Sequence, residues 1–298
     1  MPIDRDKALT ADPSVREIRW STRDVLLYHL SLGAGADPAT GPELPLTYER
    51  GLTVLPTFAL VAGSGISSGE TAEPGLHLPG IDVDLRALLH AGQGLRVHRP
   101  LPASGTATLR SRVAGVWDKG RAALVVLEST ATGPDGQALW TTTTRVWARG
   151  EGGFSQDPGP EDERVTPPDR PADTVLTSVT APQQALWYRL NGDLNPLHAD
   201  PAFARAAGFD RPILHGLASY GLVGKALVDG VLDGDVTRLT GLDARFAGPL
   251  VPGESLTTSV WRTGPAAEGT ERLVLHTACP ERDGAPVLTH ATATVVAS

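Results

Sequence analysis

The sequence predicts an α+β protein made of two similar units. Residues 96–110 match residues 245–259 in the order of their turn residues and alternating strand residues. Each copy is followed by further polar and apolar alternation, an Asp-Gly turn and a Thr-rich segment, which is typical of antiparallel hairpins. Because helical segments precede these hairpins instead of alternating regularly with strands, the pattern favours the α+β class.

The first unit is expected to open with a helix over 22–32, ahead of its strands. Its last hairpin turns at Asp135-Gly136 and continues into a Thr-rich strand over 138–148. An Asp-Gly pair between two alternating segments is a strong hairpin signal, because both residues tolerate a positive φ.

The second unit repeats this order, with a helix expected over 182–190 and a final strand over 286–297 after the turn at Asp283-Gly284. It also carries a second helical segment over 217–228. That segment is apolar on most sides and contains small residues, so it predicts a mostly buried helix.

The length and the repeat together predict two domains. A chain of 298 residues exceeds the size at which one core keeps growing. We expect a first unit over 1–150 and a second over 173–298. Residues 151–172 between them are rich in Gly, Pro, Asp and Glu, which bury little apolar surface, so they predict a surface linker.

Composition excludes several classes of partner. The formal net charge of −8 argues against nucleic acid, because phosphate binding needs a basic face. No segment approaches the roughly 18–20 unbroken apolar residues that span a bilayer, so membrane insertion is not expected. The only cysteine, Cys279, cannot form an internal disulfide, and the first residues do not resemble a secretory signal. We therefore expect a cytoplasmic protein.

One short segment concentrates chemistry: Tyr188-Arg-Leu-Asn-Gly-Asp-Leu-Asn-Pro-Leu-His198. Gly192 and Pro196 interrupt the preceding helix, so Asp193, Asn195 and His198 are predicted to share a tight bend and to face one small volume. An imidazole beside a carboxylate suits acid–base catalysis near neutral pH, with Asn195 orienting a water or holding the pair. The alternative is ordinary turn and helix-capping chemistry.

The segment after His198 predicts a short alanine-rich helix, a loop over 208–216 and the buried helix over 217–228. Gly216 stands just before that helix, where backbone N–H groups favour negative charge and a glycine permits close approach. It is the candidate donor to an oxyanion, with a plain turn glycine as the alternative. For His215 we favour a structural role that locks the loop.

The motif from Tyr188 to His198, followed by Gly208-Phe-Asp-Arg-Pro-Ile-Leu-His-Gly216, resembles the hydratase 2 motif of MaoC-like enoyl-CoA hydratases. Residues 20–28 and 119–126 also resemble the hydratase 2 unit of peroxisomal multifunctional enzyme type 2. The resemblance spans essentially the whole chain. One departure is Asn191, where family members often carry Ser or Thr before the Gly-Asp pair; both side chains can bond nearby backbone.

The resemblance implies a double hot-dog fold, in which each unit is a helix wrapped by a curved antiparallel sheet. It also implies hydration of trans-2-enoyl-CoA to (3R)-3-hydroxyacyl-CoA without metal or cofactor, by a homodimer. The residues themselves also predict no metal site, because the eight histidines are scattered along the sequence without paired ligand spacing. The substrate-binding candidates are Tyr188, Asn191, Gly192, Arg205, Arg211 and Lys225. Solvated surface charge is the alternative for the last three.

The first unit lacks the motif. Aligning Tyr28 with Tyr188 places Gly33 where Asp193 stands, so the first unit is expected to be catalytically silent. We expect it to provide space for the acyl group, with the loop over 51–79 contributing. Three other functions stay open: a dehydratase of a related carrier-bound or branched or ring-bearing thioester, a thioesterase, and a non-catalytic hot-dog binding protein. The intact Asp193, Asn195 and His198 argue against the binding protein.

Overall fold

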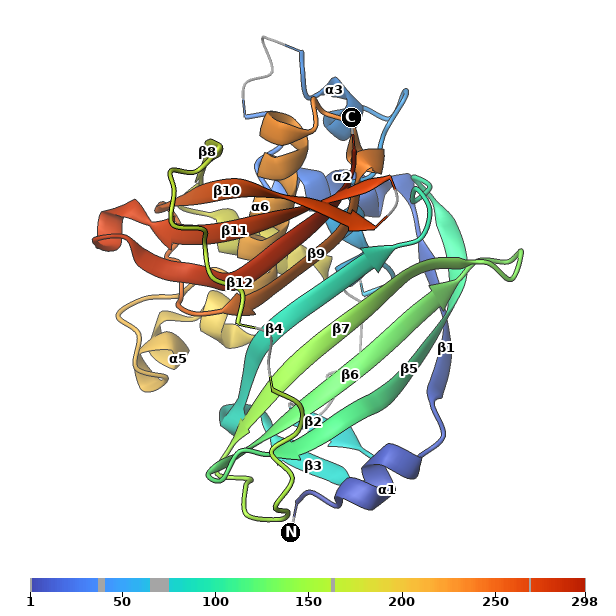
Figure 1. Ribbon diagram of the computed structural model, residues 1–298, viewed down its shortest axis with the longest axis vertical. Coiled ribbons are helices and arrows are strands. Elements are labelled where there is room, and N and C mark those ends of the chain that lie inside the picture. Colours follow the sequence, from blue (N-terminus) through green and yellow to red (C-terminus); the bar gives the residue numbers. More distant parts are fainter. Residues whose placement is uncertain (1, 37–40, 65–74, 162–163, 268, 298) are drawn as a thin grey trace.

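A computed structural model describes residues 2–36, 41–64, 75–161, 164–267 and 269–297. Their central feature is one ten-stranded sheet with the order β1-β5-β6-β7-β4-β9-β12-β11-β10-β8 (Figure 1). All the pairings within it are antiparallel. A separate two-stranded sheet pairs β2 with β3.

The first half of the chain contributes half of the large sheet and a few short helices. Its helices are α1 (Arg5–Thr10), α2 (Thr22–Ser31) and α3 (Leu44–Thr47), with 3₁₀ turns η1 (Pro56–Leu60) and η2 (Leu85–Ala87). Its strands are β1 (Ser14–Trp20), β2 (Gly75–Leu78), β3 (Ile81–Asp84), β4 (Leu88–Val97), β5 (Gly105–Asp118), β6 (Ala122–Thr132) and β7 (Ala138–Arg149).

The second half contributes the other five strands of the large sheet and the longest helix. Its helices are α4 (Gln184–Tyr188), α5 (Pro201–Ala206) and α6 (Gly216–Val231), with 3₁₀ turns η3 (Arg189–Asn191), η4 (Pro196–His198), η5 (Val236–Arg238) and η6 (Pro280–Arg282). Its strands are β8 (Thr174–Val179), β9 (Leu239–Phe246), β10 (Ser255–Ala267), β11 (Thr270–Cys279) and β12 (Ala285–Val296).

The strand order reads the same from both ends, because each strand of the first half has a counterpart in the second. The two halves meet where β4 pairs with β9, and the pairs Leu95 with Leu242 and Gln93 with Ala244 are related by the internal symmetry. The predicted repeat and the α+β class are thereby confirmed. Both Asp-Gly hairpin turns form as expected, with Gly136 and Gly284 at positive φ.

Helix α6 packs inside the second half and also contacts the first. Its central residues are buried, including Tyr220, Leu227 and Val228. Glycines let it approach the first half closely: a Cβ on Gly221 would lie 2.8 Å from the Tyr28 hydroxyl oxygen, and one on Gly224 would lie 2.7 Å from Thr57. Between α2 and β4, the helical segments in the described part of the first half are at most five residues long.

Between β7 and β8 the chain runs over the molecular surface (Figure 1). The described residues of 151–172 form no helix or strand. They are tied to the second half by the Trp261 indole N–H, which donates to the carbonyl of Arg170 at 2.9 Å, and by His290 Nδ1 and the carbonyl of Val165 at 2.9 Å.

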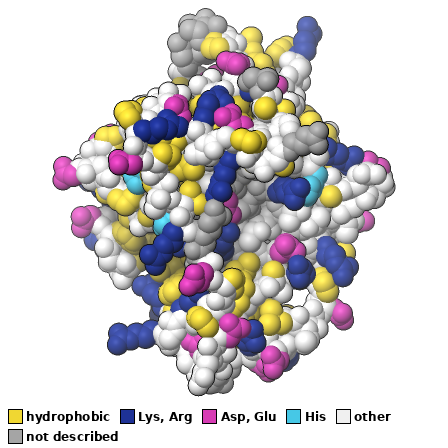
Figure 2. Space-filling view, in the orientation of Figure 1, with side chains coloured by type: hydrophobic (Ala, Val, Ile, Leu, Met, Phe, Trp, Pro, Cys, Tyr) yellow, Lys and Arg dark blue, Asp and Glu magenta, His cyan; other side chains and the backbone are white. Residues whose placement is uncertain are grey.

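The surface carries both signs of charge. Lys and Arg side chains are interspersed with Asp and Glu on the face shown in Figure 2. Across the described ranges, none of the helices combines the length and the apolar character needed to cross a lipid bilayer.

A buried histidine of the first half ties two loop segments to α2. His29 has no exposed surface; its Nδ1–H donates to the carbonyl of Leu46 at 2.8 Å, and its Nε2 accepts from the N–H of Leu55 at 3.1 Å. Burial lowers the pKa of His29 to about 4. The neutral ring is therefore the form that fits the folded chain.

We predict that His29 makes the fold acid-sensitive. Below pH ~6.5 the unfolded chain binds a proton that the folded chain excludes, so this contribution is present above that pH and is lost as the pH falls toward 4. Between pH ~7 and ~5 the free energy of unfolding should fall by about 2 kcal/mol more in the wild type than in His29→Gln. Urea titrations at both pH values measure this, and equal losses in the two proteins would contradict it.

Candidate active site

The bend that carries the candidate residues is held by its own side chains. Turn η3 ends at Gly192, which has a φ of 116°. The Asn195 side-chain oxygen accepts from the N–H of Leu197 at 3.0 Å and so caps η4. The N–H of Asn195 donates to the Asp193 carboxylate at 3.2 Å. Asn195 therefore positions both Asp193 and the turn that carries His198.

His198 lies buried at the end of η4 with a defined tautomer. Its Nδ1–H donates to the carbonyl of Ile213 at 2.9 Å, which leaves Nε2 without a proton. Burial lowers the pKa of His198, while the Ile213 carbonyl and Asp193 oppose that shift. The neutral ring offers Nε2 as a proton acceptor at physiological pH.

His215 stacks on His198 and closes the loop. The ring centroids lie 3.7 Å apart with an interplanar angle of 28°. His215 Nε2–H donates to the backbone carbonyl of Asp193 at 3.2 Å. Burial, followed by the neighbouring His198, lowers the pKa of His215 to about 4. His215 is thus a neutral support between the two loops.

The structure brings two histidines and a carboxylate together, which corrects the expectation that the histidines are scattered. The ligand atoms of Asp193, His198 and His215 lie within 4.8 Å of one another. The sequence hid this group because the two histidines are 17 positions apart, on different loops. Such a set could hold a metal ion. Stacked rings direct their in-plane lone pairs side by side instead of toward one point, so the geometry fits an acid–base pair better.

Gly216 begins α6 beside this cluster. The first N–H groups of a helix have no intrahelical acceptor, so its N–H is available to a ligand. A Cβ at this position would lie 3.1 Å from the Phe246 ring, so a larger residue would require that ring to move by a few tenths of an ångström. Phe246 in turn packs edge-on against His90 of β4, with centroids 4.7 Å apart.

Tyr188 and Asn191, which the sequence predicted to bind substrate, support the candidate site by packing and hydrogen bonding. Tyr188 is 1% exposed and packs against Tyr28 and His215, because its large ring belongs to the core between the halves. The Asn191 amide donates to the hydroxyl of Ser31 and to the carbonyl of Tyr188, both at 2.9 Å. The bond to Ser31 fastens the bend to α2 of the first half.

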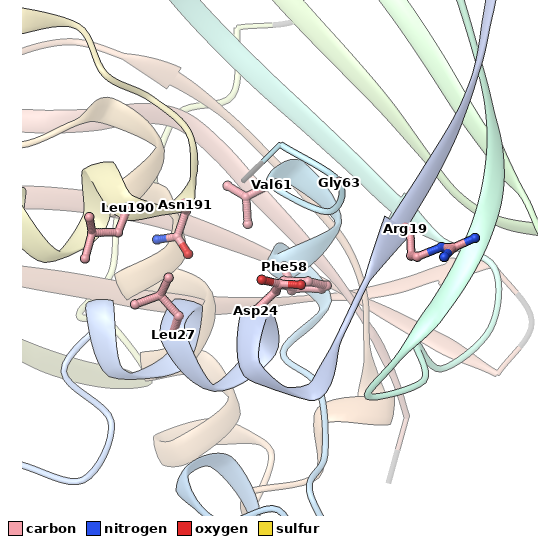
Figure 3. Close-up of a pocket in the computed structure, with 8 residues that line it drawn as sticks. All are labelled: Arg19, Asp24, Leu27, Phe58, Val61, Gly63, Leu190 and Asn191. Atoms are coloured by element: carbon pink, nitrogen blue, oxygen red, sulfur yellow. The ribbon is translucent and has the colours of Figure 1, made fainter. Parts of the chain in front are cut away.

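A small cavity of about 130 Å³ lies where this bend meets the first half (Figure 3). Leu190 and Asn191 face Leu27 of α2 and Val61, which follows η1, while Arg19 lies apart on β1 (Figure 3). The first half therefore forms part of the wall beside the candidate residues.

The segment after η1 lies directly against the bend that carries the candidate residues. A Cβ on Gly192 would lie 1.6 Å from the carbonyl oxygen of Ser64. Ser64 belongs to the loop over 51–79, of which residues 65–74 lie outside the described ranges. The described part of this loop therefore reaches the site, and the glycine is required both by its positive φ and by this contact.

The three predicted cationic contacts separate into two groups. Arg205 and Arg211 are exposed on the segments that follow His198. Lys225 is not beside the site: it lies nine residues along α6 from Gly216, or roughly 13 Å. It forms ion pairs with Glu43 and Asp229, so its charge is already matched. This corrects its assignment to the site.

Sequence reasoning missed the contribution of the first half's sheet. His90 and Gln93 of β4, together with Ser64 and Leu217, line a cavity of about 280 Å³ over the sheet of the first half, and Ser64 also lies against Gly192 of the bend. Burial lowers the pKa of His90, and the nearby charge of Asp193 partly opposes that shift. Nothing in the sequence marked β4, because the neighbour relation depends on its pairing with β9.

Comparison with known proteins agrees with this architecture. Residues 19–150 match the MFE-2 hydratase 2 N-terminal domain, and residues 163–278 match the MaoC like domain. The enoyl-CoA hydratase ChsH3 of Mycobacterium tuberculosis is 48% identical over 288 residues, covering 97% of each chain. The chain belongs to the MaoC-like hydratase 2 family.

Solved structures place this family member in the double hot-dog fold. A MaoC-like dehydratase from Phytophthora capsici superposes with a TM-score of 0.86 at 28% identity, covering 99% of this chain and 98% of the other. A Mycobacterium tuberculosis protein described as a double hotdog fold, at 15% identity, has a TM-score of 0.59 and covers 96% of each chain. The expected fold is confirmed.

We predict that Gly192→Ala disturbs the bend of this hydratase 2 family member. The added methyl group meets the Ser64 carbonyl and also strains a left-handed backbone, so the free energy of unfolding should fall by about 2 kcal/mol relative to a matched control. The control is Gly234→Ala, which has a φ of 79° but no atom within 4 Å of the new Cβ. Thermal unfolding of both variants measures the difference. Equal stabilities would show that the Ser64 contact does not constrain the bend.

Proposed function

We propose that the protein catalyses the reversible hydration of trans-2-enoyl-CoA to (3R)-3-hydroxyacyl-CoA, without metal or cofactor. The observation that carries this proposal is the pair formed by Asp193 and His198: a carboxylate oxygen of Asp193 lies within 4.8 Å of a ring nitrogen of His198, and the Nδ1 bond to Ile213 leaves Nε2 free of a proton. The pair stands beside the N-terminus of α6 and a cavity for an acyl chain. The hydratase name of the 48% identical relative agrees with it.

Hydration adds the oxygen of water to C3 and a proton to C2. Asp193 and His198 hold the water between them and take its proton as the C3–O bond forms and the double bond shifts toward the thioester. The pair then returns a proton to C2 as the enolate collapses. Burial keeps His198 neutral, so it is ready to accept a proton at pH ~7.

The negative charge that develops on the thioester oxygen needs a donor. The N–H of Gly216 meets this need, because it is unpaired by the helix and the positive end of the α6 dipole adds to its field. Residues Leu217, Ile18, Leu60, Leu109 and Trp140 give the adjoining cavity apolar walls for the acyl group. The first unit thus binds the acyl chain and is catalytically silent.

Exposed positive charge near the site indicates where the CoA part of the substrate binds. Arg205 and Arg211 are exposed beside the site and meet the phosphates of CoA, whereas Lys225 takes no part. The cytoplasmic location stays a prediction from the sequence.

A second candidate is dehydration of a related 3-hydroxyacyl thioester, carrier-bound or with a branched or ring-bearing acyl group. The dehydratase name of the Phytophthora capsici structure favours including it. The same residues serve both directions, since a reversible reaction uses one transition state. A thioesterase would release free thiol from the substrate, so a thiol assay distinguishes it from a hydratase and from a dehydratase.

We predict that Asp193→Asn and His198→Gln each lower kcat for crotonyl-CoA hydration by roughly a hundred- to ten-thousand-fold. The double variant should lose little more than the worse single variant, because the residues act on one water. Loss of absorbance by the conjugated thioester measures the rate.

Asp283→Asn is the matched control, because Asp283 lies in the β11–β12 turn and Asn also accepts its positive φ. It should keep wild-type activity. Near-wild-type rates for both site variants across short, medium and branched enoyl-CoAs would overturn the proposed function.

We further propose a homodimer, supported by an apolar surface on adjacent helices of the two halves. Leu30 of α2 and Leu186 and Trp187 of α4 are 48%, 52% and 39% exposed. Sedimentation should show a species of about twice 31.2 kDa. Leu186→Glu should dissociate it, because a charge would be buried in the interface. Val15→Glu, at a 57% exposed residue of edge strand β1, is the control. A wild-type protein that sediments only as a monomer would contradict the proposal.

A further inference from the structure

The cavity over the first half's sheet has a polar wall as well as apolar ones. Five Ser, Thr and Gln side chains of the sheet line it with neutral hydrogen-bonding groups: Gln93, Ser111, Ser129, Thr142 and Thr144. They come from β4, β5, β6 and β7, which lie side by side in the sheet. We call these five residues the polar belt.

The second half shows what the same sheet positions carry when a helix covers them. Strand register relates the row Ser111, Ser129 and Thr142 to the row Val260, Leu275 and Ala291, and the pair Gln93 and Thr144 to Leu242 and Ala293. All five counterparts are apolar, and each is at most 2% exposed. The fold therefore accepts apolar residues here, and the polar belt is particular to the half with the cavity.

The polar belt keeps hydrogen-bonding capacity to spare. The hydroxyls of Ser111 and Ser129 bond each other at 2.7 Å, which engages only one of their two O–H donors in that bond. The Thr142 hydroxyl lies 3.5 Å from the carbonyl of Ser129, at the limit of a useful bond. Thr144 and His90 both contact the Gln93 amide oxygen, at 3.0 and 3.1 Å. A plain alkyl chain lying on Thr142, Ser129 and Ser111 would cover hydroxyl groups without giving them a partner.

We infer that the acyl group bound by this protein carries a neutral oxygen substituent, a hydroxyl or an oxo group, remote from the thioester. The inference rests on the proposed function. Four neighbouring strands at ~4.8 Å spacing place Ser111 roughly 14 Å across the sheet from Gln93, so the oxygen belongs on a long or ring-bearing acyl group. The belt itself holds no cation, and Arg16, which also lines the cavity, is exposed on β1, so a neutral oxygen fits better than a carboxylate.

The test compares kcat/KM for trans-2-dodecenoyl-CoA with that for its ω-hydroxy, ω-oxo and ω-carboxy derivatives. The wild type should prefer the hydroxy or oxo substrate over the alkyl substrate by roughly three- to tenfold, the range of one hydrogen bond. The variant Ser129→Ala with Thr142→Val should lose this preference and gain activity on the alkyl substrate. Thr143→Val is the matched control, because Thr143 lines a groove with Thr141 and Glu128 on the other face of β7.

Crotonyl-CoA hydration is measured for the wild type and for each variant. It distinguishes a failure of the proposed function from a failure of this inference. If crotonyl-CoA and all the longer thioesters are inert, the proposed function fails and this inference with it. If they are hydrated but the alkyl substrate is equal or preferred, or the belt variant behaves like Thr143→Val, the proposed function stands and the inference is overturned. A preference for the ω-carboxy substrate would also overturn it.

Discussion

The hydrogen bond from His198 Nδ1 to the carbonyl of Ile213 is the interaction on which the site depends. At 2.9 Å it joins two loops whose bonded residues are 15 positions apart, fixes the tautomer of the imidazole and leaves Nε2 without a proton. His215 holds the same two loops together by stacking on His198 and bonding the carbonyl of Asp193, and Asn195 caps the turn that carries His198. Burial lowers the pKa of both His198 and His215, so the two stacked rings stay neutral.

A second constraint is the unequal use of two similar halves. The sheet is continuous across the β4–β9 pairing, yet α6 covers it only in the second half, where Leu242 and Val260 are buried. In the first half Gln93 and Ser111 take those places beside a cavity. In the proposed function the second half supplies the acid–base pair and the first half the space for the acyl group, and the two meet where the Ser64 carbonyl lies over Gly192.

The sequence predicted the features that local patterns encode. Turn chemistry and periodicity predicted the Asp-Gly turns, the repeat around residues 96–110 and the buried helix over 217–228. The structure confirms all three. The sequence could not show that His215 stacks on His198, that His90 lies beside Phe246, or that ion pairs hold Lys225 away from the site. Those contacts depend on strand register and on the packing of loops, which no local pattern records. Tyr188 shows the same limit, because this motif residue is buried in the core.

A crystal structure of Asp193→Asn bound to an enoyl-CoA tests the central claim most directly. The account predicts that the thioester oxygen accepts from the N–H of Gly216, that C3 faces His198 Nε2 across one water, and that the acyl chain enters the cavity beside Gln93. A thioester bound elsewhere, with position 193 and His198 turned away from C3, would contradict it.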